Sequence, residues 1–149
     1  MTEIQLKTRI GLSIVISHFS ILLLVVVLFL FGGFIFEEMT TTIALIIPMF
    51  GIYTSAIIKH IIANRKILQT DSEMVTKDYI FISFMIPSIF IIFIISIVIL
   101  KAFNIGFTSF EQFKTMLAIG ETMFGAYFGI VLSSMFNINT EVEKANNKK

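Results

Sequence analysis

The stretch IGLSIVISHFSILLLVVVLFLFGGFIF, residues 10–36, decides the fold class. Its 27 residues (10–36) contain no Asp, Glu, Lys or Arg. A membrane-spanning helix needs about 20 apolar residues, whereas the core of a signal peptide has only about 7–15. Because this run is too long and no small-x-small cleavage site follows it, we predict that it is retained as a membrane span.

Three further apolar stretches follow the first. Hydrophobic residues make up 56% of the 149-residue chain and charged residues only 14%, which leaves too little polar surface for a soluble domain. We therefore predict one all-α integral membrane domain over residues 1–149, with four transmembrane helices. The spans are Ile10–Phe36, Thr40–Ile58, Tyr79–Leu100 and Thr115–Phe136 (10–36, 40–58, 79–100 and 115–136), with a basic loop at 59–78 and a tail at 137–149.

The basic residues predict the orientation. Nine of the 11 Lys and Arg residues fall on the side that holds both termini and the loop 59–78, and cytoplasmic segments are the ones enriched in Lys and Arg. Both termini are therefore predicted to be cytoplasmic, in a bacterial inner (plasma) membrane. The nine are Lys7, Arg9, Lys59, Arg65, Lys66, Lys77, Lys144, Lys148 and Lys149; the other side carries Lys101, Lys114, Glu37, Glu38 and Glu111.

A short sequence repeats between the second and fourth spans. Met49–Tyr53 reads MFGIY and Met123–Tyr127 reads MFGAY, at an offset of 74 (123 − 49), and Phe36-Glu37 matches Phe110-Glu111 at the same offset. The match indicates a duplicated helical hairpin with a parallel 2+2 repeat, or a chance identity in a sequence of low diversity.

Small residues recur on one stripe of the second span and one of the fourth. Small side chains let helices approach closely in lipid. We expect these two spans inside the bundle and the third span, which has no polar face at Ile89–Ile95, largely exposed to lipid. The stripes are Ala44, Pro48, Gly51 and Ser55 with Thr54 beside them, and Gly125, Ala126, Gly129 and Ser133.

Glu121 is the one ionisable residue inside the fourth span. It lies one to two turns below the outer boundary and, by steps of four, on the face of Gly125, Gly129 and Ser133. A charge inside a membrane is costly and usually marks a function. Glu121 can line an aqueous pore, carry a proton or ion, or bond to a neighbouring helix. In a symmetric oligomer it would form a ring that favours cations, with Thr54, Ser55 and Ser133 also on the ion path.

His18 lies in the first span among serines. It is either a hydrogen-bonded packing residue or part of a polar relay. A metal site is not expected, because the only other histidine is His60 and the chain has no Cys.

The basic cluster Lys59, Arg65 and Lys66 has two interpretations. It is a topology signal in contact with anionic lipids, or it binds an acidic partner or an oligonucleotide. No phosphate loop, zinc pattern or nucleophile elbow occurs, so neither enzymatic activity nor a cofactor is predicted.

The layout of residues 10–136 resembles the small four-span membrane effectors of bacterial anti-phage defence. The most similar is the channel component of Hailong systems, with the Kiwa membrane component second, and the stretch Pro48–Lys59 carries the resemblance. It implies a homotetrameric ion channel that depolarises the membrane and is held closed by a cytoplasmic regulatory protein or by the oligonucleotide that this partner makes.

Two other functions remain open. One is a small proton-coupled transporter resembling the small multidrug exporters, although their membrane-embedded glutamate lies in the first span and Glu121 lies in the fourth. The other is an accessory subunit of a larger membrane complex.

Overall fold

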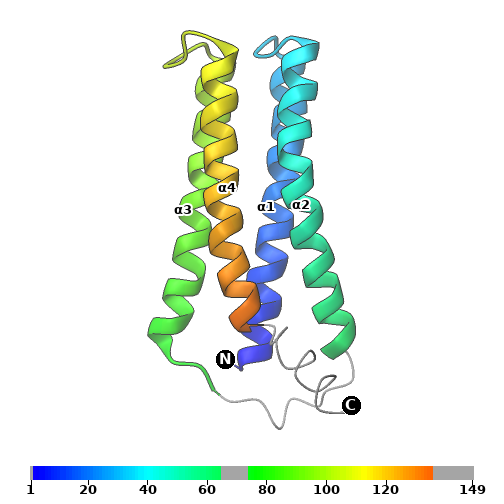
Figure 1. The fold of residues 1–149 in the computed structure, drawn as a ribbon, viewed down its shortest axis with the longest axis vertical. Helices are drawn as coiled ribbons and strands as arrows, with labels where there is room; N and C mark the ends of the chain where they lie inside the picture. Colours follow the sequence, from blue (N-terminus) through cyan, green and yellow to red (C-terminus); the bar gives the residue numbers. More distant parts are fainter. Residues whose placement is uncertain (1, 65–73, 136–149) are drawn as a thin grey trace, which may run out of the picture.

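The protein is an all-α bundle of four helices (Figure 1). The computed structural model describes residues 2–64 and 74–135. The predicted all-α class and the number of helices are confirmed over this part of the chain. The helices are α1 (Glu3–Leu30), α2 (Phe36–Asn64), α3 (Lys77–Ala102) and α4 (Phe110–Met135).

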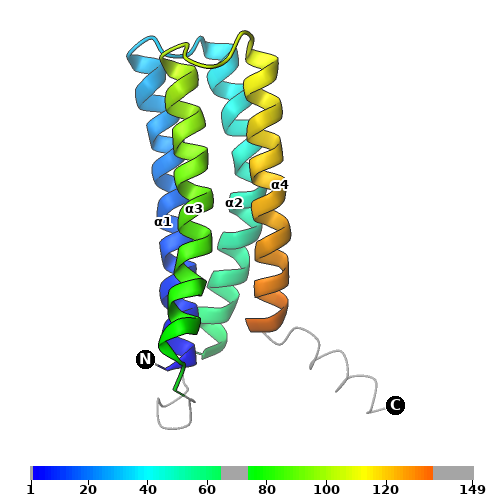
Figure 2. The same cartoon turned by 90° about the vertical axis from the view of Figure 1, so that its left-hand side faces the viewer.

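Each helix occupies one corner of the bundle. The packed pairs are α1 with α2, α3 with α4, α1 with α3, and α2 with α4, so α1 and α4 lie on one diagonal and α2 and α3 on the other. Figures 1 and 2 show two antiparallel hairpins standing side by side. The expected division into inner helices α2 and α4 and an outer α3 is therefore wrong.

The third helix packs on two neighbours. Its buried residues begin near its start and continue to its last turn: Ser83, Pro87, Ile94, Ile97, Val98, Lys101 and Ala102. The packed face of α3 could not be recognised in the sequence, because the helix is apolar around its whole circumference. No amphipathic pattern distinguishes the packed side from the exposed side.

The first helix ends six residues before the expected limit of its span. Leu30 is the last residue of α1, and Gly32 in the turn that follows adopts a positive φ of 79°. The N–H groups of Gly32 and Gly33 donate to the carbonyls of Phe29 and Leu28, both at 2.9 Å, which satisfies two carbonyls at the helix end. The turn is as apolar as the helix, so hydropathy alone placed it inside the span.

The fourth helix begins five residues earlier than the expected span. The hydroxyl of Ser109 accepts a bond from the N–H of Gln112 at 3.4 Å, and Oε1 of Gln112 accepts one from the N–H of Thr108 at 3.0 Å. These bonds satisfy N–H groups that have no partner within a helix. They fix the start of α4 at Phe110.

In the part of the chain that the structure describes, three helices are long and apolar enough to cross a membrane; α4 is not among them, so the fourth predicted span, 115–136, stays a prediction. The three helices contain the segments Gln5–Leu30, Phe36–Lys59 and Lys77–Ala102. Their outward faces carry large apolar side chains, such as Leu23, Phe81 and Ile92, at 57–65% exposure. The bundle is therefore compatible with a multi-pass membrane protein.

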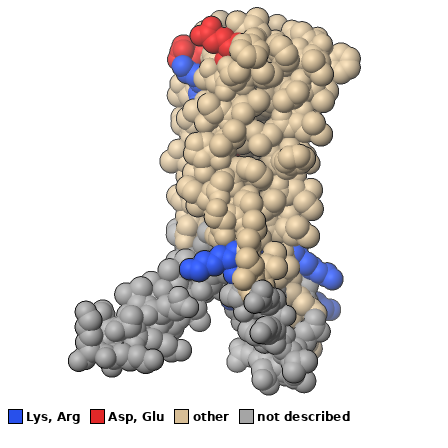
Figure 3. Space-filling view, turned by 90° about the vertical axis from the view of Figure 1, so that its right-hand side faces the viewer, with Lys and Arg blue, Asp and Glu red and all other residues tan. Residues whose placement is uncertain are grey.

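The two ends of the bundle differ in charge. One end holds the start of α1 with Lys7 and Arg9, and the start of α3 with Lys77. The opposite end holds the starts of α2 and α4 with Glu38 and Glu111. Figure 3 shows acidic groups beside basic groups near the top of one face, and basic groups near its base. We call these the acidic end and the basic end.

The core consists of two apolar clusters stacked along the bundle. The acidic-end cluster includes Ile21, Ile46, Ile94 and Leu117, and the basic-end cluster includes Ile14, Tyr53, Ile57, Phe124 and Phe128. Along α1, His18 lies between Ile14 and Ile21. Along α4, Glu121 lies between Leu117 and Phe124. Polar residues therefore lie where the two apolar clusters meet.

Candidate functional site

A buried polar cluster lies at the junction of the two apolar clusters. It consists of His18 from α1, Tyr53 from α2 and Glu121 from α4, which are 0%, 2% and 4% exposed. We call these three residues the polar cluster. Burying such groups in an apolar core costs free energy unless they are bonded, so three together at one level point to a function.

Aromatic rings hold the polar cluster in place. The imidazole of His18 lies 5.4 Å from the ring of Tyr53 and 5.3 Å from that of Phe124, and Tyr53 and Phe124 meet edge to face at 5.2 Å between centroids. Phe90 of α3 also reaches Phe124, at 5.5 Å. All four helices therefore contribute to the site or its walls.

The hydrogen bonding of His18 fixes which ring nitrogen carries the proton in the neutral ring. Nδ1 lies 3.0 Å from the backbone carbonyl of Ile14. A carbonyl oxygen only accepts, so Nδ1 is the donor, and Nε2 of neutral His18 presents a lone pair to the core. That Nε2 atom is buried and has no hydrogen-bond partner.

The polar cluster has more acceptors than donors. Both carboxylate oxygens of Glu121, Nε2 of His18 and the hydroxyl of Tyr53 are buried without partners. An ionised Glu121 and a neutral His18 together supply three acceptor atoms, and the Tyr53 hydroxyl supplies the one donor. An added proton or cation would reduce this imbalance. Chemically, the site is suited to binding positive charge.

Gly125 leaves room for Met49 of α2. A Cβ atom built on Gly125 would collide with the terminal methyl of Met49, and it would lie 3.5 Å from the Tyr53 hydroxyl, an ordinary contact distance. Gly125 is one turn beyond Glu121. The missing side chain of Gly125 therefore lets Met49 approach α4 next to the polar cluster.

Glu121 lies well inside α4. It is 11 residues beyond Phe110 (121 − 110), or about three helical turns from the start of the helix, and six residues beyond Thr115 (121 − 115), where the expected span begins. Its inward neighbours are Leu117, Phe124 and Phe128. Along the predicted stripe, Gly125 still packs against α2, whereas Gly129 faces outward, because each step of four residues rotates by about 40°.

Most of the predicted packing residues face away from the core. Gly51 and Gly129 would have nothing within 4 Å of an added Cβ, and Ala126 is exposed. Gly125 alone of the four makes a close approach within the chain, to Met49, and other close helix contacts occur at glycines that were not predicted. A Cβ on Gly11 would lie 2.8 Å from Ile57, and one on Gly120 would lie 2.8 Å from Phe93.

Of the remaining predicted site residues, those that the structure describes do not join the polar cluster. Thr54 is half-buried with an unpartnered hydroxyl, whereas Ser55 and Lys59 are exposed and line a shallow groove on α2 with Ile58 and Ile62. Arg65 and Lys66 lie outside the described residues, as does the side chain of Ser133 in α4.

Sequence reasoning missed Tyr53 as a site residue. It ends the repeated MFGIY segment, and its counterpart Tyr127 is only half-buried. Phe50 and Phe124, which occupy the same position in the two repeats, both contact His18, at 6.3 and 5.3 Å between ring centroids. The repeat was the signal that could have indicated a shared site around His18.

Among residues 2–64 and 74–135, no three His, Cys, Asp or Glu side chains come together as a metal site. No protein-family model, curated protein or solved structure matches the chain.

Proposed function

We propose that this protein is a multi-pass membrane protein that conducts protons or small cations through the interior of its bundle, with Glu121 on the path. The main support for the proposal is the Glu121 carboxylate, which lies where the two apolar clusters meet. It is 4% exposed, and neither of its oxygens has a hydrogen-bond partner. An acid at that depth is costly to keep unless it serves a function. His18 and Tyr53 provide further polar atoms at the same level.

In this proposal each chain carries its own path. Glu121 packs inside a single bundle, so a ring of carboxylates around a shared axis would require α4 to turn. Assembly into a homo-oligomer, with a tetramer as the expected state, then uses the outer faces of α2 and α4. Those faces carry small residues, namely Ala44, Pro48, Gly51 and Ser55, and Thr122, Ala126 and Gly129.

The described conformation corresponds to a closed state. Fully buried side chains fill the core on both sides of the polar cluster, including Phe113 and Leu117 toward the acidic end and Ile14 and Leu6 toward the basic end. Conduction therefore requires these side chains to separate. A channel that rests closed fits the role suggested by the resemblance to Hailong-type effectors. That role is depolarisation of a bacterial inner membrane during phage infection, after release by a cytoplasmic partner or its oligonucleotide.

The orientation in this proposal places the basic end in the cytoplasm. Lys59 and Lys77 are exposed at that end. Basic residues prefer the cytoplasmic side.

Proton-coupled transport is the second candidate. The observation that favours it is the pairing of two proton-binding groups, His18 and Glu121, in one occluded core. A transporter would alternate access to this site rather than open a continuous path.

Purified protein in planar bilayers and in pH-jump vesicles tests both candidates. We expect wild type to conduct and Glu121→Gln, which keeps shape but removes charge, to lose conductance while staying folded. Glu111→Gln is the matched control, because Glu111 is an exposed acid on the same helix. Equal conductance in wild type and Glu121→Gln contradicts the proposal. Absence of current together with pH-driven substrate exchange, lost in Glu121→Gln, replaces the channel with the transporter.

A further inference from the structure

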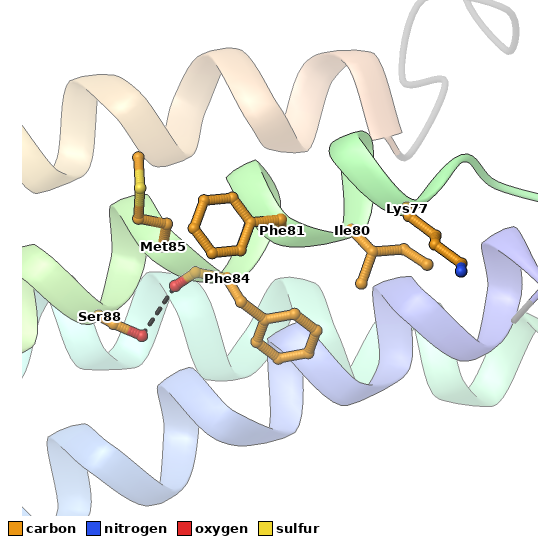
Figure 4. Close-up of a pocket in the computed structure, with 6 residues that line it drawn as sticks. All are labelled: Lys77, Ile80, Phe81, Phe84, Met85 and Ser88. Carbon is orange, nitrogen blue, oxygen red and sulfur yellow. Dashed lines mark hydrogen bonds between the residues drawn. The ribbon is translucent and has the colours of Figure 1, made fainter.

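An apolar groove with a lysine at one end runs along the outer face of α3. It has a volume of about 440 Å³ and is lined by Lys77, Ile80, Phe81, Phe84, Met85 and Ser88. Figure 4 shows Lys77 at the end of the row nearest the start of α3 and Ser88 at the other end. We call this the α3 groove.

The polar atoms of the α3 groove differ in what they can bind. The hydroxyl of Ser88 donates to the carbonyl of Phe84 at 2.7 Å, so it is already used within the helix (Figure 4). Lys77 is exposed at the mouth. The neighbouring charge, Asp78, does not line the groove. The groove therefore presents one cation at its mouth and apolar walls beyond it.

The dimensions of the α3 groove match one leaflet of a bilayer. Lys77 and Ser88 are 11 residues apart (88 − 77), which is about 16 Å along a helix. The hydrocarbon core of a bilayer is about 30 Å thick, so one leaflet is about half of that. A lipid whose head group contacts Lys77 can lay one acyl chain along Phe81 and Met85 as far as Ser88.

The charge at the mouth selects the class of lipid. From this geometry we propose that the α3 groove binds one anionic glycerophospholipid, with the phosphate at Lys77 and an acyl chain along the apolar wall. Anionic lipids interact favourably with Lys and Arg at the membrane surface. A similar groove on α2 is also lined by a lysine, Lys59, whereas the groove at the acidic end is lined by Glu111.

The absence of tryptophan from the sequence allows a direct test. The chain contains no Trp, so Met85→Trp places a single fluorophore in the α3 groove. Ile16→Trp is the matched control, because Ile16 is a 56% exposed residue on α1 that does not line the groove. Lipids brominated on the acyl chain quench a Trp that they touch. Each variant is reconstituted twice in a mixture of phosphatidylglycerol and phosphatidylcholine. In the first sample only the phosphatidylglycerol is brominated, and in the second only the phosphatidylcholine is brominated.

We expect at least twofold more quenching by brominated phosphatidylglycerol than by brominated phosphatidylcholine for Met85→Trp. The ratio of quenching by brominated phosphatidylglycerol to quenching by brominated phosphatidylcholine should be near one for Ile16→Trp. Adding Lys77→Gln to Met85→Trp should return this ratio to near one. Each Trp is compared with itself, so differences in depth cancel. A ratio near one for Met85→Trp overturns the proposal, as does an equal preference at Ile16→Trp. A ratio unaffected by Lys77→Gln also overturns it. Circular dichroism of each variant checks that the fold is kept, and ion conductance plays no part in the result.

Discussion

The ammonium of Lys101 lies 3.1 Å from a carboxylate oxygen of Glu38 and joins α3 to α2 across a diagonal of the bundle at its acidic end. The rings of Phe34 and Phe110 lie 5.5 and 5.9 Å from the same ammonium. Both side chains of the pair are largely buried, at 9% and 18% exposure. The pair therefore adds a polar link between the two hairpins at the acidic end, where their helices also pack through apolar side chains.

Removing one partner of this ion pair should destabilise the bundle. Lys101→Met leaves Glu38 largely buried without its cation, and we expect a loss of about 2–3 kcal/mol in the free energy of unfolding. Denaturation of the purified protein in detergent measures it. The double variant Lys101→Met/Glu38→Leu should recover much of the loss because neither charge remains. Lys114→Met is the control: its pair with Glu111 is exposed, so the change should stay within about 0.5 kcal/mol.

Glu121 should lower the free energy of unfolding of the bundle, and it should also be necessary for conduction. Glu121→Leu replaces an unpartnered buried carboxyl with an apolar side chain of similar size, so we expect the free energy of unfolding to rise by about 1–3 kcal/mol. Conductance in planar bilayers should be lost at the same time. A variant that is both less stable and inactive would instead mean that Glu121 holds the bundle together.

Two glycines on α4 should respond in opposite ways to added bulk. Gly120→Val meets Phe93 of α3, so it should lower the unfolding temperature and disturb the single-chain fold. Gly129→Val has open space around it within the chain, so the fold should be kept. If the outer face of α4 joins neighbouring copies, Gly129→Val should reduce the oligomer in native mass measurement. An undiminished oligomer would show that this face serves another purpose.

The charge polarity predicts the orientation in the membrane. Reporter fusions at Lys149 should be active in the cytoplasm, and fusions near Glu38 should be active in the periplasm, because the basic end prefers the cytoplasmic side. A periplasmic signal from the C-terminal fusion would reverse the assignment of both ends.

Helix number and charge polarity could be predicted because each depends on local sequence. The length of an apolar run and the positions of Lys and Arg do not depend on how the helices pack. The turn after Leu30 was less accurate, because it is as apolar as the helix before it. The start of α4 could be predicted from the capping pattern of Ser109 and Gln112, although it lies outside the apolar span.

The inward face of each helix could not be predicted, because it depends on all four helices together. Small residues alone did not reveal it: Gly11 and Gly120 make close contacts, whereas Gly51 and Gly129 face outward. The composition of the polar cluster could not be predicted for the same reason. His18 and Glu121 were each recognised as unusual, but only the packing of α1, α2 and α4 brings them to one level with Tyr53.

The hydroxyl of Tyr53 should contribute to conduction rather than to folding. Tyr53→Phe keeps the ring contacts with His18 and Phe124 and removes only the donor that faces the acceptor atoms of the polar cluster. We expect unchanged or slightly higher stability, because the hydroxyl has no partner. If the hydroxyl forms a hydrogen bond only during conduction, its loss at about 1 kcal/mol corresponds to about a fivefold change in rate, so conductance should fall by about that factor. Tyr127→Phe, at the matching position of the second repeat and only half-buried, is the control and should conduct like wild type. An equal fall in both variants would assign the effect to the aromatic packing around Phe90, which contacts Tyr127 at 6.3 Å, and not to the polar cluster.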